Sequence, residues 1–264
     1  MSLLFSLRKA IFIGSAVASF SAVFCNALPG RAQIGLSPLF LEEQAVRGKA
    51  QGVITLLNST NQPIRVRLYS EAFTYGQDGF VSLENDPMDL SSYLQFSPRE
   101  VVIPAETEQR IRLLSLFPPN LPEGEYRATV FAEELTENAA NENGAAISIR
   151  IGSTIYVHQG ELAPALSGLG AQLASEPTTL ELLVGNQGSA TARAEVKWAL
   201  EQSGVTVAQG ETSPKTVIAG GDRTFPLALP AALPAGSYRL HGDFTWTTHG
   251  EVSTEAFDLP VLVP

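Results

Sequence analysis

The side chains best suited to acid–base or metal chemistry are three histidines, His158, His241 and His249. Their spacing matches no metal-binding motif such as HExxH. His241 and Asp243 share one face of a strand pattern, but two groups do not form a catalytic site. The sequence has no glycine-rich phosphate loop and no GxSxG turn. It therefore predicts a protein that is not an enzyme and uses no cofactor, metal or small-molecule substrate.

Residues 145–152 (AAISIRIG) indicate a different kind of function, the binding of a partner through a β-strand. With a period of two, Ile147, Ile149 and Ile151 share one face and Arg150 lies on the other. A polar segment, residues 136–144 (TENAANENG), precedes them. Two interpretations stay open. The isoleucines either fill their own sandwich, as any last strand does, or belong to an edge strand that pairs with a partner.

A repeated phrase identifies the elements that must position this strand. The sequence LPEGEYR at 121–127 reappears as LPAGSYR at 233–239, each time followed by a β-type run. A strand, a Pro/Gly corner, a tyrosine and another strand are typical of an immunoglobulin-like sandwich, in which the tyrosine hydroxyl bonds to nearby backbone. We therefore expect structural corners at Tyr126 and Tyr238, and an all-β fold of two tandem immunoglobulin-like sandwiches.

Short β-type runs, separated by turn residues, fill the rest of the chain, and few helices are expected. The predicted domains are 33–158 and 166–264, joined by a linker at 159–165. The first domain has extra residues between Asn58 and its corner, so 75–98 should hold a surface loop or an added edge strand. The predicted strands are Ile34–Leu41, Gly52–Asn58, Ile64–Phe73, Tyr93–Phe96, Gln109–Leu116, Tyr126–Glu134, Ala146–Val157, Gly168–Leu173, Thr178–Val184, Ala192–Leu200, Thr206–Gln209, Thr224–Leu229, Tyr238–Trp246 and Glu251–Val261.

Residues 1–32 are typical of a cleaved secretory signal. Arg8 and Lys9 precede an apolar run, residues 10–24, which is shorter than the roughly 20 residues that span a membrane. Cleavage is expected after Ala32 or Ala27, which removes the only cysteine and places the protein in the periplasm. Loss of three basic residues would make the formal charge of −10 still more negative. Such acidity argues against nucleic acid and anionic membranes as partners.

The chain resembles the PapD-like family of periplasmic pilus-assembly chaperones, best over 34–158 and more loosely over 164–264. The matching residues are Leu36-Ser37-Pro38, Asn58 and Pro63, Phe96-Ser97-Pro98, Val102-Ile103-Pro104, Glu108-Gln109-Arg110-Ile111-Arg112 and Tyr126-Arg127. The resemblance implies two immunoglobulin-like domains in an L, and a first domain that lends its last strand to an incomplete pilin subunit. The lent positions would be Ile147, Ile149 and Ile151, with Ala145 as an outer member. Pilin-like or other secreted β-rich subunits, and an outer-membrane usher, would be the partners.

One departure affects how a client is anchored. The family clamps the client's terminal carboxylate with an Arg in the first strand and a Lys in the last. The matching positions hold Glu42, at or near the Arg position, and Thr154. Arg47, Lys49 or Arg150 is a candidate substitute, although Arg150 projects opposite the isoleucines. The alternative function is a structural or adhesive exported protein with two complete immunoglobulin-like domains and no client.

Overall fold

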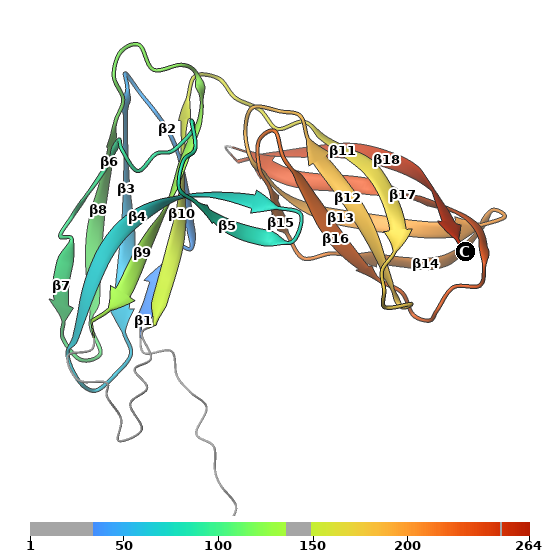
Figure 1. Ribbon diagram of the computed structural model, residues 1–264, viewed down its shortest axis with the longest axis horizontal. Coiled ribbons are helices and arrows are strands. Elements are labelled where there is room, and N and C mark those ends of the chain that lie inside the picture. The colour runs from blue at the N-terminus through green and yellow to red at the C-terminus, as the bar shows by residue number, and fades with distance from the viewer. Residues whose placement is uncertain (1–33, 136–148, 249) are drawn as a thin grey trace, which may run out of the picture. The chain divides into compact units, whose positions relative to one another are not determined.

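The structure is a computed structural model that describes residues 34–135, 149–248 and 250–264. These residues belong to one compact unit, Ala32–Pro264. Within the described ranges every regular element is a β-strand, and the strands form two sandwiches (Figure 1). The predicted all-β fold of tandem immunoglobulin-like sandwiches is confirmed. The predicted signal peptide, residues 1–32, lies outside the described residues.

The first sandwich consists of a four-stranded and a six-stranded sheet. The smaller sheet has the order β1-β3-β8-β6, which are Ile34–Ser37, Lys49–Asn58, Glu108–Leu116 and Leu94–Ser97. The larger has the order β2-β10-β9-β4-β5, which are Phe40–Gln44, Arg150–Gln159, Gly124–Glu134, Ile64–Gly76 and Gly79–Leu83. In this sheet β7, Glu100–Ile103, also pairs with β4. The pairing of β2 with β10 is parallel, and the other pairings in this sandwich are antiparallel.

The second sandwich consists of a three-stranded and a five-stranded sheet. The smaller has the order β11-β12-β16, which are Leu166–Leu173, Thr179–Asn186 and Asp222–Ala228. The larger has the order β14-β13-β17-β18, which are Val205–Glu211, Ala192–Gln202, Gly236–Thr248 and Glu251–Val263. In this sheet β15, Lys215–Val217, also pairs with β13.

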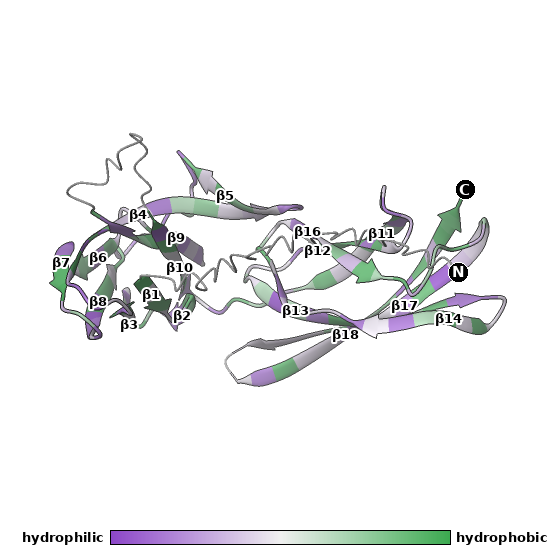
Figure 2. Cartoon of the chain, turned by 90° about the horizontal axis from the view of Figure 1, so that it is seen from below, coloured by the Kyte–Doolittle hydropathy of each residue, from purple (hydrophilic) through white to green (hydrophobic). Residues whose placement is uncertain are grey.

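Each sandwich has its own hydrophobic core, because alternate side chains of its strands point between the two sheets. The first core includes Ile54, Leu56, Val66, Ile111, Val130 and Ile155, all at most 1% exposed. The second includes Leu182, Val196, Phe225, Leu240 and Phe244, all fully buried. Figure 2 shows the matching alternation of hydrophobic and hydrophilic residues along strands such as β18.

A buried asparagine occurs at the same place in both sandwiches. Asn58 ends β3 and its Nδ2 donates to the carbonyls of Ile103 and Pro104, both at 3.0 Å. Asn186 ends β12 and its Nδ2 donates to the carbonyls of Ala190, at 2.8 Å, and Val217, at 3.1 Å. Buried carbonyls need such donors. The two halves of the chain therefore share a buried asparagine that donates to carbonyl groups, as well as a strand pattern.

The two corner tyrosines have matching hydrogen bonds. Tyr126 Oη donates to the carbonyl oxygen of Pro122 at 3.1 Å. Tyr238 Oη donates to that of Pro234 at 2.8 Å. Both rings are buried in the core of their own sandwich. Each hydroxyl thus reaches back to the proline of the repeated phrase that precedes it.

Some strand boundaries differ from the sequence-based expectation. The pattern predicts one strand over Ile34–Leu41, but the chain forms β1 in one sheet and β2 in the other, with Pro38, which has no N–H to donate, at the crossing. The short strands β7 and β15 are not predicted by the periodicity. The extra segment at 75–98 does contain an added edge strand, β5, as expected.

Candidate functional site: the open edge of strand β10

Strand β10 is covered unequally on its two sides. On one side it pairs with β9 along its whole length, from Arg150 to Gln159. On the other side β2 pairs with it only from Thr154 to His158. Residues 150–152 therefore have no neighbouring strand on that side among the described residues; we call this segment the open edge. A strand with unpaired backbone N–H and C=O groups is a template for adding another strand.

Two of the predicted client-binding residues lie at or next to the open edge. Ile151 is partly buried and packs against the first core. Ile149, just before β10, is 40% exposed, and its carbonyl accepts a hydrogen bond from the amide of Glu134 at 3.1 Å. Ile147 and Ala145 lie outside the described residues. Of the predicted isoleucines that the structure describes, Ile151 thus lies at the margin of the first core and Ile149 at the surface.

The open edge ends where the chain between β1 and β2 reaches β10. The Ser153 hydroxyl donates to the carbonyl of Pro38 at 2.8 Å, and the Thr154 amide donates to that of Leu39 at 3.0 Å. Leu39 and Phe40 are 59% and 47% exposed at this point. An added strand would therefore have to stop at Leu39, and it would meet two exposed apolar side chains there.

The structure does not gather the predicted anchor residues into one site. Arg47 lies in the exposed turn between β2 and β3, and Lys49 is the exposed first residue of β3; both follow the end of β2 that pairs with His158. Arg150 stacks on the Phe131 ring, 4.5 Å from its centroid, and donates to the Tyr69 hydroxyl at 3.2 Å. Thr154 is buried.

A buried polar cluster that sequence reasoning missed lies at the covered end of β10. The Glu125 carboxylate lies 3.2 Å from His158 Nε2 and 3.7 Å from Arg127 Nη1. It also accepts hydrogen bonds from the Thr191 amide at 2.6 Å and the Thr191 hydroxyl at 2.5 Å. Glu125 and His158 are 3% and 0% exposed. The carboxylate thus links β9 and β10 to the residue that precedes β13. The signal in the sequence is a charged pair, Glu125 and Arg127, within the repeated corner phrase.

An arginine–aromatic cluster lies at the start of β2. Arg193, on β13, places its guanidinium carbon 3.3 Å from the Phe40 ring centroid and 5.2 Å from that of Tyr156. Tyr156 and Phe73 are buried together with Ile218, and Tyr75 packs against them. Burial raises the pKa of the Tyr156 phenol far above its usual value. These residues come from strands far apart in the sequence, so periodicity did not associate them.

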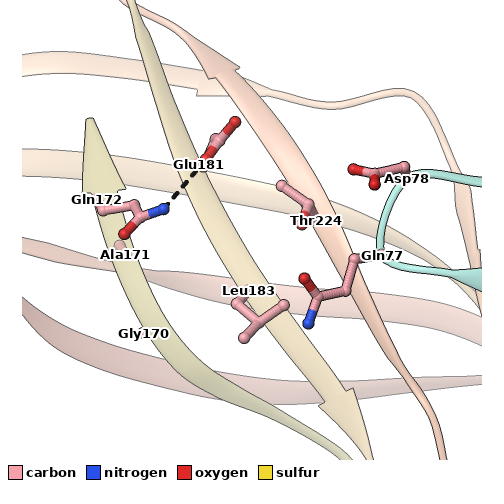
Figure 3. A pocket seen from close by; sticks show the side chains of 8 residues that line it. All are labelled: Gln77, Asp78, Gly170, Ala171, Gln172, Glu181, Leu183 and Thr224. Atoms are coloured by element: carbon pink, nitrogen blue, oxygen red, sulfur yellow. Dashed lines mark hydrogen bonds between the residues drawn. The ribbon is translucent and has the colours of Figure 1, made fainter. Parts of the chain in front are cut away.

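The added β4–β5 hairpin contacts the second sandwich. The Thr224 amide donates to the Gln77 carbonyl at 3.2 Å, and Gln77 Nε2 donates to Asp222 at 2.9 Å. Arg223 Nη1 donates to the Gly76 carbonyl at 2.8 Å. A pocket of about 370 Å³ lies beside these contacts (Figure 3), lined by Gln77, Asp78, Gly170, Ala171, Gln172, Glu181, Leu183 and Thr224. Its polar side chains are amides, carboxylates and one hydroxyl, with no nucleophile–base pair.

The described residues contain no group of three His, Cys, Asp or Glu side chains arranged to hold a metal ion. In the same part of the chain, no helix has the length and apolar character needed to cross a membrane.

No protein-family model and no curated protein matches the chain by sequence. Solved structures do match its fold. A chain of the CsuC–CsuE chaperone–tip adhesion subunit complex, from archaic chaperone-usher Csu pili of Acinetobacter baumannii, is 14% identical with a TM-score of 0.53; the match covers 88% of this chain and 100% of that one. The YadV chaperone is 15% identical with a TM-score of 0.52, covering 86% and 100%. A chain of the chaperone–tip adhesin complex of CFA/I fimbriae is 13% identical with a TM-score of 0.50, covering 86% and 99%.

These matches define the class of fold. The chain has the two-domain fold of these chaperone structures, which is the fold that its sequence motifs predicted, at 15% identity or less. At such identities the likeness is one of fold.

Proposed function

We propose that this protein is an exported chaperone that binds pilin-like or other secreted β-rich subunits through the open edge of β10. The observation that carries the proposal is the unequal cover of β10. Because β2 begins only at the position opposite Thr154, residues 150–152 have no neighbouring strand on that side within the described ranges, and a client strand would pair there. The fold shared with structures of chaperones in complex with tip adhesins supports the same function.

The binding would combine two contributions. Backbone groups of the open edge would hydrogen-bond to the client strand, and Ile149 and Ile151 would fill the client's hydrophobic groove together with Ile147 and Ala145. Each isoleucine buried in this way contributes roughly 1.5–3 kcal/mol. Several such residues would hold a subunit that lacks a strand and prevent it from aggregating through its own open groove.

The proposal includes the organisation predicted from the sequence. Residues 1–32 would be removed on export to the periplasm, and the modules would be 33–158 and 166–264, joined at 159–165. An outer-membrane usher would be the second partner, receiving the client from the chaperone. No catalytic activity is part of the proposal.

The experiment that tests it is a comparison of two exposed apolar residues. Ile149→Asp places a charge next to the open edge; since Ile149 is already 40% exposed, the fold should tolerate it. Val252→Asp, at a residue 70% exposed on β18, is the matched control. Tagged variants are recovered from the periplasm of the native host, and co-purifying subunits are identified by mass spectrometry. We expect at least tenfold less subunit with Ile149→Asp and no change with Val252→Asp.

Equal recovery of the same subunits with both variants, at unchanged unfolding midpoints, would rule out strand lending by β10. Recovery of no β-rich subunit with the wild type would instead favour the structural or adhesive alternative.

A further inference from the structure

A pocket of about 350 Å³ lies at one margin of the second sandwich. Strand β14 of the larger sheet and strand β16 of the smaller sheet both line it, and each is an edge strand among the described residues. The apolar part of the lining includes Trp198 and Leu227, which are buried and belong to the second core. A volume of about 300–1,000 Å³ with a mostly apolar lining is typical of small-molecule sites.

The indole ring of Trp198 reaches this pocket because residue 210 has no side chain. Trp198 on β13 pairs with Gly210 on β14. A Cβ at position 210 would lie 3.1 Å from Cζ2 of the indole and 3.2 Å from its Nε1. Gly210 itself lines the pocket, so the Nε1 edge of the indole lies beside it. The Trp198 Nε1–H has no acceptor among the described residues.

Lys215, on β15, is the cation of the pocket. Its Nζ donates to the carbonyl oxygen of Thr224 at 3.3 Å and lies 5.9 Å from the centroid of the Phe225 ring. Within the described ranges no carboxylate forms an ion pair with it. Burial, and then the charge of Arg223, lower the pKa of this amine. An ammonium group has three donors, so Lys215 is a partly desolvated cation with unused donors and no counterion.

Glu211 also lines the pocket but does not neutralise Lys215. It pairs with Lys197 on β13, and directly paired side chains share one face of a sheet. Lys197 is exposed, between the buried residues Val196 and Trp198, so this face is the outer one. The Glu211 side chain is exposed as well. The only charge directed to the inner part of the pocket is therefore positive among the residues that line it.

These groups define the chemistry of a ligand. The apolar surface of Trp198 and Leu227 favours a hydrocarbon part, because its burial removes apolar surface from water. The unpaired ammonium of Lys215 favours a carboxylate, since charge-assisted hydrogen bonds are the strong ones. The hydroxyl of Ser213, which also lines the pocket, is a further donor. A neutral or cationic ligand of the same shape would leave the Lys215 charge without a counterion.

We propose that the second sandwich binds a medium-chain aliphatic carboxylate in this pocket, with its hydrocarbon chain against Trp198 and Leu227 and its carboxylate on Lys215. The site binds its ligand without a reaction. It goes beyond the proposed function, because all of its residues lie in the second sandwich. Sequence periodicity did not associate these three residues, since they come from β13, β15 and β16.

The test uses the full mature chain and three probes with the same hydrocarbon chain, namely octanoate, octan-1-ol and octylamine. The chain has two tryptophans, so NMR of the indole N–H groups follows two signals, which Trp246→Phe assigns. We expect octanoate to shift the Trp198 signal more than that of Trp246 and to bind about tenfold more tightly than octan-1-ol. Octylamine should bind most weakly, because Lys215 and Arg223 repel it. Butanoate, with its shorter chain, should bind about tenfold more weakly than octanoate.

Three variants locate the charge that gives this preference. Lys215→Gln should lower the affinity for octanoate to that for octan-1-ol, and Lys215→Arg, which keeps the charge, should retain most of the preference. Lys197→Gln, at an exposed lysine on the outer face of β13, is the matched control and should change neither affinity. The comparison of the probes with the wild type needs no variant, so the test stands even if Lys215→Gln does not fold.

Several results would overturn the proposal. Equal binding of octanoate, octan-1-ol and octylamine to the wild type would do so, and so would no binding of octanoate. Equal affinities for butanoate and octanoate would show a simple anion site instead. An octanoate preference that Lys215→Gln leaves intact also overturns it. Ile149→Asp, in the first sandwich, should leave octanoate binding unchanged, so failure of strand lending and failure of this site are distinguishable.

Discussion

The last strands of the two sandwiches, β10 and β18, both bury apolar residues, but only β10 also buries polar ones. The buried residues of β18 are apolar, namely Phe257, Val261 and Val263. Its exposed positions include Glu251, Glu255, Asp258 and Pro260. Strand β10 also buries polar residues, Ser153, Thr154 and His158, and an exposed isoleucine, Ile149, precedes its open edge. Charges and proline along an edge discourage the addition of a foreign strand. The comparison teaches that β18 has several residues that oppose strand addition, whereas the open edge of β10 has only the charge of Arg150.

The stability of the part of β10 that β2 covers, residues 154–158, should depend strongly on the buried carboxylate of Glu125 on the neighbouring strand β9. Glu125→Ala would remove the buried carboxylate that His158 and Arg127 share, and we expect a loss of about 3 kcal/mol in the free energy of unfolding. Asp258→Ala, on β18, removes an exposed bidentate ion pair with Arg239 and should lower the free energy of unfolding much less. Chemical denaturation of both variants measures the difference. Equal losses of stability in Glu125→Ala and Asp258→Ala would show that the two strands do not differ in this respect.

Tyr156 gives β10 a pH dependence in the alkaline range, whereas β18 contains no tyrosine. Burial raises its pKa above the ordinary value of 10.0, so above that pH the unfolded chain releases a proton that the folded chain keeps. The stabilising effect is complete below pH 10 and is lost as the pH rises, at about 1.4 kcal/mol for each pH unit. Unfolding followed from pH 8 to 11 should show a steeper fall for the wild type than for Tyr156→Phe. If the free energy of unfolding falls equally with pH in the wild type and in Tyr156→Phe, the pKa of Tyr156 is not raised by folding.

The corners should be the feature in which the two sandwiches agree. Tyr126→Phe and Tyr238→Phe each remove one hydrogen bond to a proline carbonyl, and each should lower the free energy of unfolding by about 0.5–1.5 kcal/mol. Thermal unfolding of the two variants provides the measurement. If one of them leaves the unfolding midpoint unchanged, the corners are not equivalent and the two sandwiches differ by more than their last strands.

Much of the fold was predictable because it depends on local patterns. Alternating residues indicated most strands, and the repeated phrase indicated both corners and hence two sandwiches. Extra residues between Asn58 and Tyr126 predicted a surface loop or an added edge strand, and the structure has the strand, β5. The predicted single strand over Ile34–Leu41 was wrong, because residue alternation continues through Pro38 while the chain changes sheets.

The candidate site was only partly predictable. The isoleucine row was recognisable from its period, but the extent of the open edge depends on where β2 begins, which is a matter of pairing between strands far apart in the sequence. The same holds for Glu125 with Thr191 and for Arg193 with Phe40. The sequence by itself determined the elements, since side-chain periodicity and turn chemistry act between near neighbours. Only the tertiary structure decided which side of β10 stays open and which charges meet beside it, because those depend on contacts between distant strands.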